Sequence, residues 1–203
     1  MPLNSKQLPS LLWLIVLLLS CIALRFLSLS LYPLMDTTEA RYAEMARIMV
    51  ETGNWITPMF DYNIPFWGKP PMFAWLSSVG FSLFGITEFA ARIPHLFVSI
   101  MMLWLVYFFA KTHFNAKKMG LFAAAILASS FSFLTISGAV TADTALAFSI
   151  TLSMISFWFA WNKRHPIWGY LFFIGLAVGM LSKGPLALAL VLVGISLTLW
   201  LAA

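Results

Sequence analysis

The sequence has 203 residues, of which 62% are hydrophobic and only 9% charged, and its mean hydropathy is +0.92. This composition excludes an ordinary soluble domain. Because hydrocarbon cannot satisfy exposed backbone N–H and C=O groups, the long apolar runs favour membrane-spanning helices. The formal net charge of +5 comes from basic residues scattered between apolar runs, so we expect no nucleic acid partner.

The first apolar run follows Lys6 and resembles the start of a signal peptide, since the letters LLSC at 18–21 loosely match a lipoprotein cleavage site. The run continues well beyond Cys21 and is interrupted once, by Arg25, so it is long enough to cross a bilayer. We therefore expect a retained helix near residues 9–33. Because Cys21 is the single cysteine, the sequence holds no disulfide framework.

Further apolar runs of about 18 to 25 residues predict a polytopic all-α membrane protein. Counting the first, the expected spans lie near residues 9–33, 89–112, 118–138, 143–162, 166–181 and 185–203. A shorter apolar run at 70–86 is bounded by prolines and Gly85, and it either crosses the membrane or lies at its surface.

If 70–86 lies at the surface, the basic residues near the short loops share one side, as the positive-inside rule requires of a cytoplasmic face. These residues are Lys6, Lys111, Lys117, Lys118, Lys163 and Arg164. All seven acids then fall on the opposite face: Asp36, Glu39, Glu44, Glu51, Asp61, Glu88 and Asp143. We prefer this topology, which leaves residues 34–88 as an external loop.

The external loop is too long for a structureless connection, so it should hold structure of its own or carry function. Residues 37–52 place apolar and charged side chains on different sides of a helix that stops at Gly53, which predicts an amphipathic helix at the membrane surface. The chain stops inside an apolar run at Ala202-Ala203. We expect residues 1–203 to be one transmembrane domain that forms the N-terminal part of a longer polypeptide.

Asp36 lies just past the outer end of the first expected helix. With Glu39 three residues later it has the spacing of a capping box, which satisfies free amides at a helix start. It also has the position of a general base at the water interface, where a carboxylate takes the proton of an acceptor hydroxyl. The two roles are compatible, because a cap holds the carboxylate rigidly.

Lys69 lies among aromatic residues and prolines, directly before the apolar run at 70–86. Such a lysine either extends its ammonium group to the membrane interface or neutralises the phosphate of a lipid in the same leaflet. In the second case Arg41 is a suitable partner, because a guanidinium group binds phosphate with two N–H groups.

Asp143 begins the fourth expected span, and Lys183 lies between the fifth and the sixth. The helix macrodipole explains an acid at a helix start, and a lysine at a turn is ordinary. Ionisable groups are nevertheless costly near membrane depth, so several of them on one face indicate a site. No pair of the candidate residues has metal-ligand spacing, and we expect neither a metal nor another cofactor.

Three stretches resemble a known family, namely MDTTEARYAEMARIMVETGNWITP, PFWGKPPMFAWLSSVGFSLFGITEFAARIP and LSKGPLALAL. They are similar to the bacterial branch of the protein O-mannosyltransferase and aminoarabinose transferase group within the GT-C glycosyltransferases. The resemblance runs from about Leu31 to Leu190. It implies a multi-spanning enzyme that takes a sugar from polyprenyl phosphate and inverts the anomeric centre at the outer face of the membrane. It also implies that the first external loop carries the catalytic carboxylate.

The resemblance assigns roles to single residues. Glu39 and Arg41 match the group's acid-x-Arg motif, and Lys69 matches the lysine of its Lys-Pro motif. Asp143 matches the aspartate that opens the fourth span, and Lys183 matches the lysine of its Lys-Gly motif.

Two positions depart from the group's pattern. Thr38 stands where the group often has a first acid, so Asp36 is our substitute and the base stays open between Asp36 and Asp143. Gly68 stands where aminoarabinose transferases have a glutamate implicated in metal binding. This second departure disfavours both a metal at that position and aminoarabinose as the sugar.

We therefore predict an inverting, polyprenyl-phosphate-dependent glycosyltransferase of the bacterial cytoplasmic membrane, with its active site facing the periplasm or exterior. The acceptor is the hydroxyl of a lipid, a glycan or a protein, and membrane lipids surround the helices. The expected catalytic carboxylates are Asp36, Asp143 and Glu39, and the expected phosphate-binding residues are Lys69, Arg41 and Lys183.

Two other functions compete with this one. A transporter or flippase would line a path through the middle of the bilayer with charged groups, but this sequence offers charges near one face and almost none at mid-depth. A non-catalytic membrane subunit would use the external loop to dock a partner.

Overall fold

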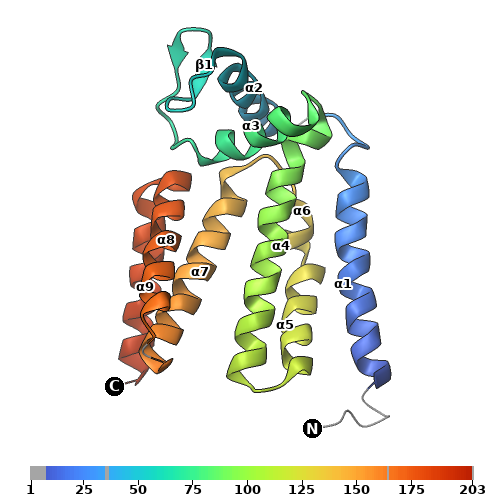
Figure 1. The fold of residues 1–203 in the computed structure, drawn as a ribbon, viewed down its shortest axis with the longest axis vertical. Helices are drawn as coiled ribbons and strands as arrows, with labels where there is room; N and C mark the ends of the chain where they lie inside the picture. The colour runs from blue at the N-terminus through green and yellow to red at the C-terminus, as the bar shows by residue number, and fades with distance from the viewer. Residues whose placement is uncertain (1–7, 35–36, 164, 203) are drawn as a thin grey trace.

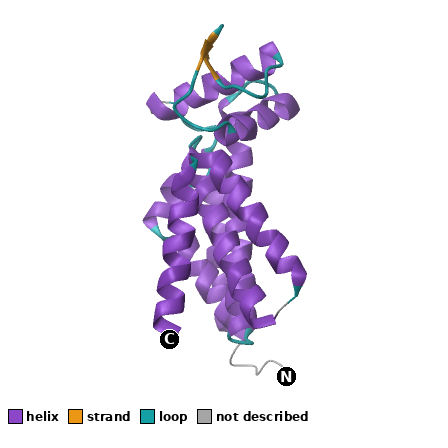
Figure 2. Cartoon of the chain, turned by 90° about the vertical axis from the view of Figure 1, so that its left-hand side faces the viewer, coloured by secondary structure: helices purple, strands orange, loops and turns teal. Residues whose placement is uncertain are grey.

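The computed structural model describes residues 8–34, 37–163 and 165–202, and these residues form two layers (Figures 1 and 2). The larger layer is a bundle of roughly parallel and antiparallel helices. Its members are α1 (Leu8–Ser28), α4 (Glu88–His113), α5 (Lys117–Ser129), α6 (Phe131–Ile136), α7 (Ala142–Lys163), α8 (Pro166–Lys183) and α9 (Pro185–Ala202). Four of these helices are long and apolar enough to cross a membrane, namely α1, α4, α7 and α8.

The second layer lies across one end of the bundle, which we call the outer end (Figure 1). It contains α2 (Thr37–Thr52), α3 (Met72–Phe84) and a hairpin of β1 (Met59–Asp61) and β2 (Ile64–Pro65). The hairpin is antiparallel and pairs Met59 with Pro65 and Asp61 with Ile64. The connections 137–141 and 184 also lie at the outer end, whereas 114–116 lies at the opposite, inner end (Figure 1).

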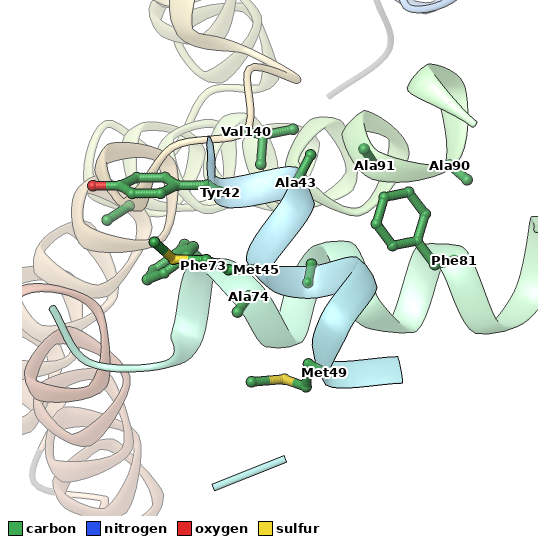
Figure 3. Close-up of a cluster of buried hydrophobic side chains, with 12 residues drawn as sticks. Tyr42, Ala43, Met45, Met49, Phe73, Ala74, Phe81, Ala90, Ala91 and Val140 are labelled. Atoms are coloured by element: carbon green, nitrogen blue, oxygen red, sulfur yellow. The ribbon is translucent and has the colours of Figure 1, made fainter. Parts of the chain in front are cut away.

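The apolar run at 70–86 forms α3 in the outer layer and does not pass through the bundle (Figure 1). The amphipathic helix expected at 37–52 is α2, but its apolar side does not face lipid. Tyr42, Met45 and Met49 are at most 1% exposed and pack in one cluster with Phe73 and Ala74 of α3 (Figure 3). The same cluster includes Ala90 and Ala91 of α4 and Ala142 of α7, so this hydrophobic core joins the outer layer to the bundle.

Gly80 lets α3 cross very close to α4. A Cβ atom placed on Gly80 would lie 1.9 Å from the carbonyl oxygen of Ala90. Further contact comes from Ser77, whose hydroxyl donates to the carbonyl of Ala91 at 3.0 Å and lies 3.1 Å from Nε2 of His95. These contacts fix the outer layer on the bundle.

The single span expected near 118–138 is two helices. Ser130 ends α5 and begins α6, because its extended backbone (φ −68°, ψ 140°) breaks the helical path and its hydroxyl accepts a hydrogen bond from the amide of Phe133. At the far end of α6, Arg25 of α1 donates to the carbonyl oxygen of Ser137 at 2.8 Å. The short helix α6 is thus fixed at both of its ends.

Candidate active site

A buried ion pair joins the outer layer to the bundle. Arg92 of α4 is 0% exposed and Glu39 of α2 is 6% exposed. The guanidinium Nε and Nη2 donate to the two carboxylate oxygens of Glu39 at 3.0 and 2.8 Å. The other guanidinium N–H groups donate to the carbonyl oxygens of Leu29, Tyr32 and Pro33 at 2.8, 2.7 and 3.1 Å. All five donors of the guanidinium group therefore have acceptors.

Glu39 makes one more contact, because its Oε1 also accepts a hydrogen bond from the amide of Val140 at 3.1 Å. Val140 lies in the connection between α6 and α7, two residues before the start of α7. A buried charge pair is tolerated only when its remaining polar atoms are satisfied, and here they are. Both carboxylate oxygens of Glu39, one of the three expected catalytic acids, are thus bound inside the protein.

Two of the expected phosphate-binding cations meet at the ring of Tyr42. The Nζ atom of Lys69 lies 5.0 Å from the ring centroid, and the Cζ atom of Arg41 lies 5.5 Å from it. Both distances are in the range of cation–π attraction. Because Tyr42 is 1% exposed and packs on the ring of Phe73 at 4.1 Å between centroids, this aromatic platform is rigid.

Asp143 and Lys183 form a second ion pair at the outer end of the bundle. The ammonium Nζ of Lys183 donates to Oδ1 of Asp143 at 2.5 Å. The side chain of Lys183 is 24% exposed, and that of Asp143 is 49% exposed. Lys183 is the last residue of α8, and the chain turns there through Gly184, whose φ of 63° is in the left-handed region that favours glycine. This turn keeps Lys183 beside the start of α7.

Lys69 and Lys183 line the same cavity, which we call the outer cavity and whose volume is about 410 Å³. It lies between the outer layer and the turn from α8 to α9. Its walls are Ile56, Thr57, Pro58, Phe66, Trp67, Gly68, Lys69, Pro70, Pro71, Lys183, Gly184 and Pro185. The ring of Phe66 fills the space beside Gly68, since a Cβ atom there would lie 2.6 Å from its Cζ. The outer cavity combines cationic groups with apolar and aromatic walls.

Asp143 lines a different cavity of about 370 Å³, which we call the bundle cavity. It lies between α4, the region of α5 and α6, and α7. Its walls are Ser99, Met102, Leu127, Ser130, Ser132, Phe133, Ile136, Ser137, Asp143, Thr144, Leu146, Ala147 and Ile150. The pair of Lys183 and Asp143 therefore stands between the two cavities, with the cation facing one and the acid facing the other.

A separate charged cluster lies on the outer surface. Arg47 binds Glu44 and Glu51, and the hydroxyl of Tyr62 also donates to Glu51. Hydrogen bonding to Arg47 holds the pKa of Glu44 below its ordinary value, and hydrogen bonds from Tyr62 and Arg47 lower the pKa of Glu51. None of these residues lines the outer cavity or the bundle cavity.

The structure brings together most of the residues expected from the sequence. Lys69 meets Arg41 at one ring and shares a cavity with Lys183, and Lys183 binds Asp143. Asp36 lies outside the described residues. Among the described residues, no group of three His, Cys, Asp or Glu side chains is placed to hold a metal ion.

Sequence reasoning assigned no role to Arg92. The available signal was its position, since an arginine inside a spanning helix is costly and needs a partner. The sequence could not name that partner, because Glu39 lies 53 residues away.

Comparison with known proteins gives a consistent result. The family model for dolichyl-phosphate-mannose-protein mannosyltransferase matches residues 10–202. An undecaprenyl phosphate-alpha-4-amino-4-deoxy-L-arabinose arabinosyl transferase of Proteus mirabilis is 34% identical over 191 residues, which are 88% of this chain and 34% of that protein. A transferase of the same name from Pseudomonas fluorescens is 31% identical over 188 residues, covering 87% of this chain and 33% of that protein.

The fold also matches a solved structure. The crystal structure of ArnT from Cupriavidus metallidurans bound to undecaprenyl phosphate has a TM-score of 0.77 and 25% identity, and the match covers 92% of this chain and 36% of that one. The apo form of the same protein gives a TM-score of 0.76. The chain thus spans about a third of the length of the proteins it matches, and its fold is that of a polytopic helical membrane protein, as the sequence predicted.

Proposed function

The chain belongs to the dolichyl-phosphate-mannose-protein mannosyltransferase family. From this membership we propose that it is part of an inverting glycosyltransferase. The protein moves a sugar from a polyprenyl-phosphate carrier to the hydroxyl of a lipid, a glycan or a protein. The observation that supports this most directly is the outer cavity, where Lys69 and Lys183 face one space. ArnT, a solved relative of the same fold, has been crystallised with bound undecaprenyl phosphate.

The donor's phosphate binds at the cations of the outer cavity. Lys69 and Lys183 attract it as point charges, and Arg41, which lies near the same Tyr42 ring as Lys69, adds a planar guanidinium group. As the bond between the anomeric carbon and the phosphate oxygen breaks, negative charge grows on the leaving polyprenyl phosphate. Cations that are already in place stabilise that charge without reorganising.

Asp143 is the general base that the described residues favour. The acceptor oxygen attacks the anomeric carbon from the face opposite the phosphate, and its proton passes to the carboxylate of Asp143. In the free protein Lys183 occupies that carboxylate. A donor phosphate that binds Lys183 competes with Asp143 and releases the carboxylate for the acceptor. Asp36 stays the alternative base.

We assign Glu39 to positioning. It is 6% exposed, and both of its oxygens are bound by Arg92 and Val140. Glu39 lies two residues before Arg41, and Val140 lies three residues before Asp143. The carboxylate of Glu39 therefore sets the separation between the phosphate-binding side and the Asp143 side of the site.

The site lies at the outer end of the bundle, and the basic residues Lys111, Lys117 and Lys118 belong to the inner end. The positive-inside rule then makes the inner end cytoplasmic. The reaction accordingly takes place on the periplasmic or exterior face of a bacterial cytoplasmic membrane.

Transfer by the purified complete protein tests this function. Reconstituted protein is given undecaprenyl phosphate carrying a radiolabelled sugar, together with membrane lipid and protein acceptors, and labelled product is identified by mass. Lys69→Ala should lower kcat by about 10²- to 10³-fold, because a preorganised group that stabilises the leaving charge is lost. The matched control is Lys111→Ala, which removes a lysine placed 5.7 Å from a tyrosine ring at the inner end.

The rival functions give different outcomes in the same preparation. A transporter would accumulate solute in proteoliposomes without forming a glycosylated product. A non-catalytic subunit would neither form a glycosylated product nor take up solute. Equal turnover of the Lys69→Ala and Lys111→Ala proteins would remove Lys69 from the site.

A further inference from the structure

Arg25 is a cation of the first helix that the proposed mechanism does not use. It is half-buried near the end of α1, inside the stretch of α1 that is long and apolar enough to cross a membrane. Within the described ranges, no carboxylate forms an ion pair with it. A charged group in a spanning helix is costly, so the contacts that it makes indicate what it does.

The main partner of Arg25 is a backbone carbonyl 112 residues away. Its Nε and Nη2 atoms both donate to the carbonyl oxygen of Ser137, the first at 2.8 Å, and its Nη1 atom donates to the hydroxyl of Ser28 at 3.2 Å. Ser137 directly follows α6, and carbonyl groups at the end of a helix have no partner within it. Arg25 thus ties α1 to the connection 137–141, which leads into α7.

The connection 137–141 is also held by α2. The amide of Val140 donates to Oε1 of Glu39 at 3.1 Å. Gly138, whose φ of 78° favours glycine, packs so closely that a Cβ atom there would lie 2.7 Å from Cδ2 of Leu29, the residue after α1. A cation therefore holds the first residue of this connection, and an anion holds its fourth.

Asp143 follows the connection directly as the second residue of α7. Its carboxylate meets Nζ of Lys183 at 2.5 Å, so its place depends on where the backbone of α7 begins. Glu39 fixes that beginning relative to the outer layer, and Arg25 fixes it relative to the bundle. Such fixing matters for a general base, because misplacing a reacting group by about 1 Å lowers a rate by about 10²-fold.

We propose that Arg25 is a positioning residue, which acts through the carbonyl group of Ser137 to hold Asp143 where it takes the proton of the acceptor. Arg25 itself lines neither the outer cavity nor the bundle cavity. This inference rests on the proposed glycosyl transfer and adds a residue of α1 to the groups on which it depends. Loss of Arg25 should slow the chemical step and leave donor binding unchanged, because Lys69 and Arg41 do not belong to the connection.

Steady-state kinetics of the complete protein test this role. Arg25→Gln should lower kcat by about 10²-fold and change KM for the donor by less than about twofold. Arg25→Lys should keep kcat within about fivefold of the unmodified protein, because an ammonium group can still donate to one carbonyl. The matched control is Arg47→Gln, the same change at a surface arginine that pairs with Glu44 and Glu51. Equal kcat values for Arg25→Gln and Arg47→Gln would overturn the proposal.

A double variant separates the positioning of Asp143 from a general structural role. Residues that act as a unit do not have additive effects, so Arg25→Gln should slow the Asp143→Asn protein by less than about threefold. Product is measured with radiolabelled donor over long incubations, because the Asp143→Asn protein is slow. A further loss as large as that in the unmodified background would show that Arg25 acts apart from Asp143, and the proposal would fall.

Hydrogen exchange tests the contact without any transfer. The amides of Ala139 and Thr141 donate to the carbonyls of Ile136 and Ala139 at 3.0 and 2.9 Å. In the complete protein in nanodiscs, Arg25→Gln should speed exchange in peptides covering 137–141 about tenfold or more, and Arg47→Gln should not. Unchanged exchange would overturn the proposal. Faster exchange in a preparation whose unmodified protein transfers no sugar would count against the proposed function and leave the contact standing.

Gly138→Ala replaces Arg25→Gln if that variant does not fold. The added methyl group would meet Leu29 and move the connection away from Arg25. The same fall in kcat and the same faster exchange are expected, and values equal to those of the unmodified protein would overturn the proposal.

Discussion

Arg92 shows how a single residue can organise the outer end of this protein. It is fully buried and each of its N–H groups has an acceptor, and these acceptors come from the segment that follows α1 and from α2. A lysine has three donors and no planar fork, so it cannot replace these contacts. The pairing depends on the shape of the guanidinium group as much as on its charge.

Arg92→Lys should therefore be strongly destabilising. The substitution leaves the buried carboxylate of Glu39 without its two guanidinium donors. Breaking such a buried pair costs about 3–5 kcal/mol of unfolding free energy. Denaturant titration in mixed micelles measures the loss. Arg47→Lys is the matched control, since Arg47 pairs with Glu44 and Glu51 on the surface, where ion pairs contribute little. Equal losses in the two variants would contradict the organising role of Arg92.

The sequence was enough to single out the candidate charged residues, but it did not show which residues they contact. Lys69, Asp143 and Lys183 stood out because charged groups are rare beside apolar runs. Their grouping could not be read from the sequence, because Lys183 and its partner Asp143 are 40 residues apart and belong to different helices. Ser137 gave no signal at all, since an isolated serine in an apolar run is ordinary until its surroundings are known.

The close crossing of α3 and α4 restricts which residues can replace Gly80 at the crossing point. Replacing glycine with alanine inside a helix normally stabilises it by up to about 1 kcal/mol. At Gly80 the new Cβ would meet the carbonyl oxygen of Ala90, so the two helices must move apart. We expect Gly80→Ala to destabilise the protein by about 1–3 kcal/mol, as overpacking does in other cores.

Gly169 provides the comparison for this prediction. It lies in α8, and a Cβ atom there would have nothing within 4 Å. Gly169→Ala should be neutral or stabilising in the same thermal unfolding experiment. A Gly80→Ala protein that melts at or above the temperature of the Gly169→Ala protein would show that α3 can shift on α4 without cost.

Helix positions were largely readable from apolar runs, but a break inside such a run was not. The run at 118–138 is long and apolar enough for one span, but a single serine cap divides it into α5 and α6. Hydropathy is insensitive to such a cap because one hydroxyl barely changes the average over a span. The apolar side of α2 was also visible, but whether lipid or α3 would cover it depended on tertiary packing.

The whole molecule separates its charges along the bundle axis. Lys69, Asp143 and Lys183 belong to the outer end, and Lys111, Lys117 and Lys118 to the inner end. This separation was predictable because the lysines gather at the short connections that the positive-inside rule assigns to one face. The way the bundle helices pair was not predictable, since every helix offers an apolar surface to every other.

Cysteine labelling tests the orientation. In a Cys21→Ser background, Trp67→Cys places a thiol at an 82% exposed position of the outer layer, and Phe114→Cys places one at a 57% exposed position of the inner end. A membrane-impermeant maleimide added to intact spheroplasts should label position 67 at least tenfold faster than position 114. Permeabilisation should equalise the two rates. The reverse order would place the candidate site in the cytosol, where this reaction scheme does not apply.

The pairing of Glu39 with Arg92 has a consequence for biosynthesis. Glu39 leaves the ribosome 53 residues before Arg92, which at ordinary elongation rates is roughly 3 to 10 s. During that interval the carboxylate lacks the guanidinium of Arg92, so we expect it to stay in water after the first helix has left the translocon. The outer layer can close only once the helix bearing Arg92 has entered the membrane beside the first.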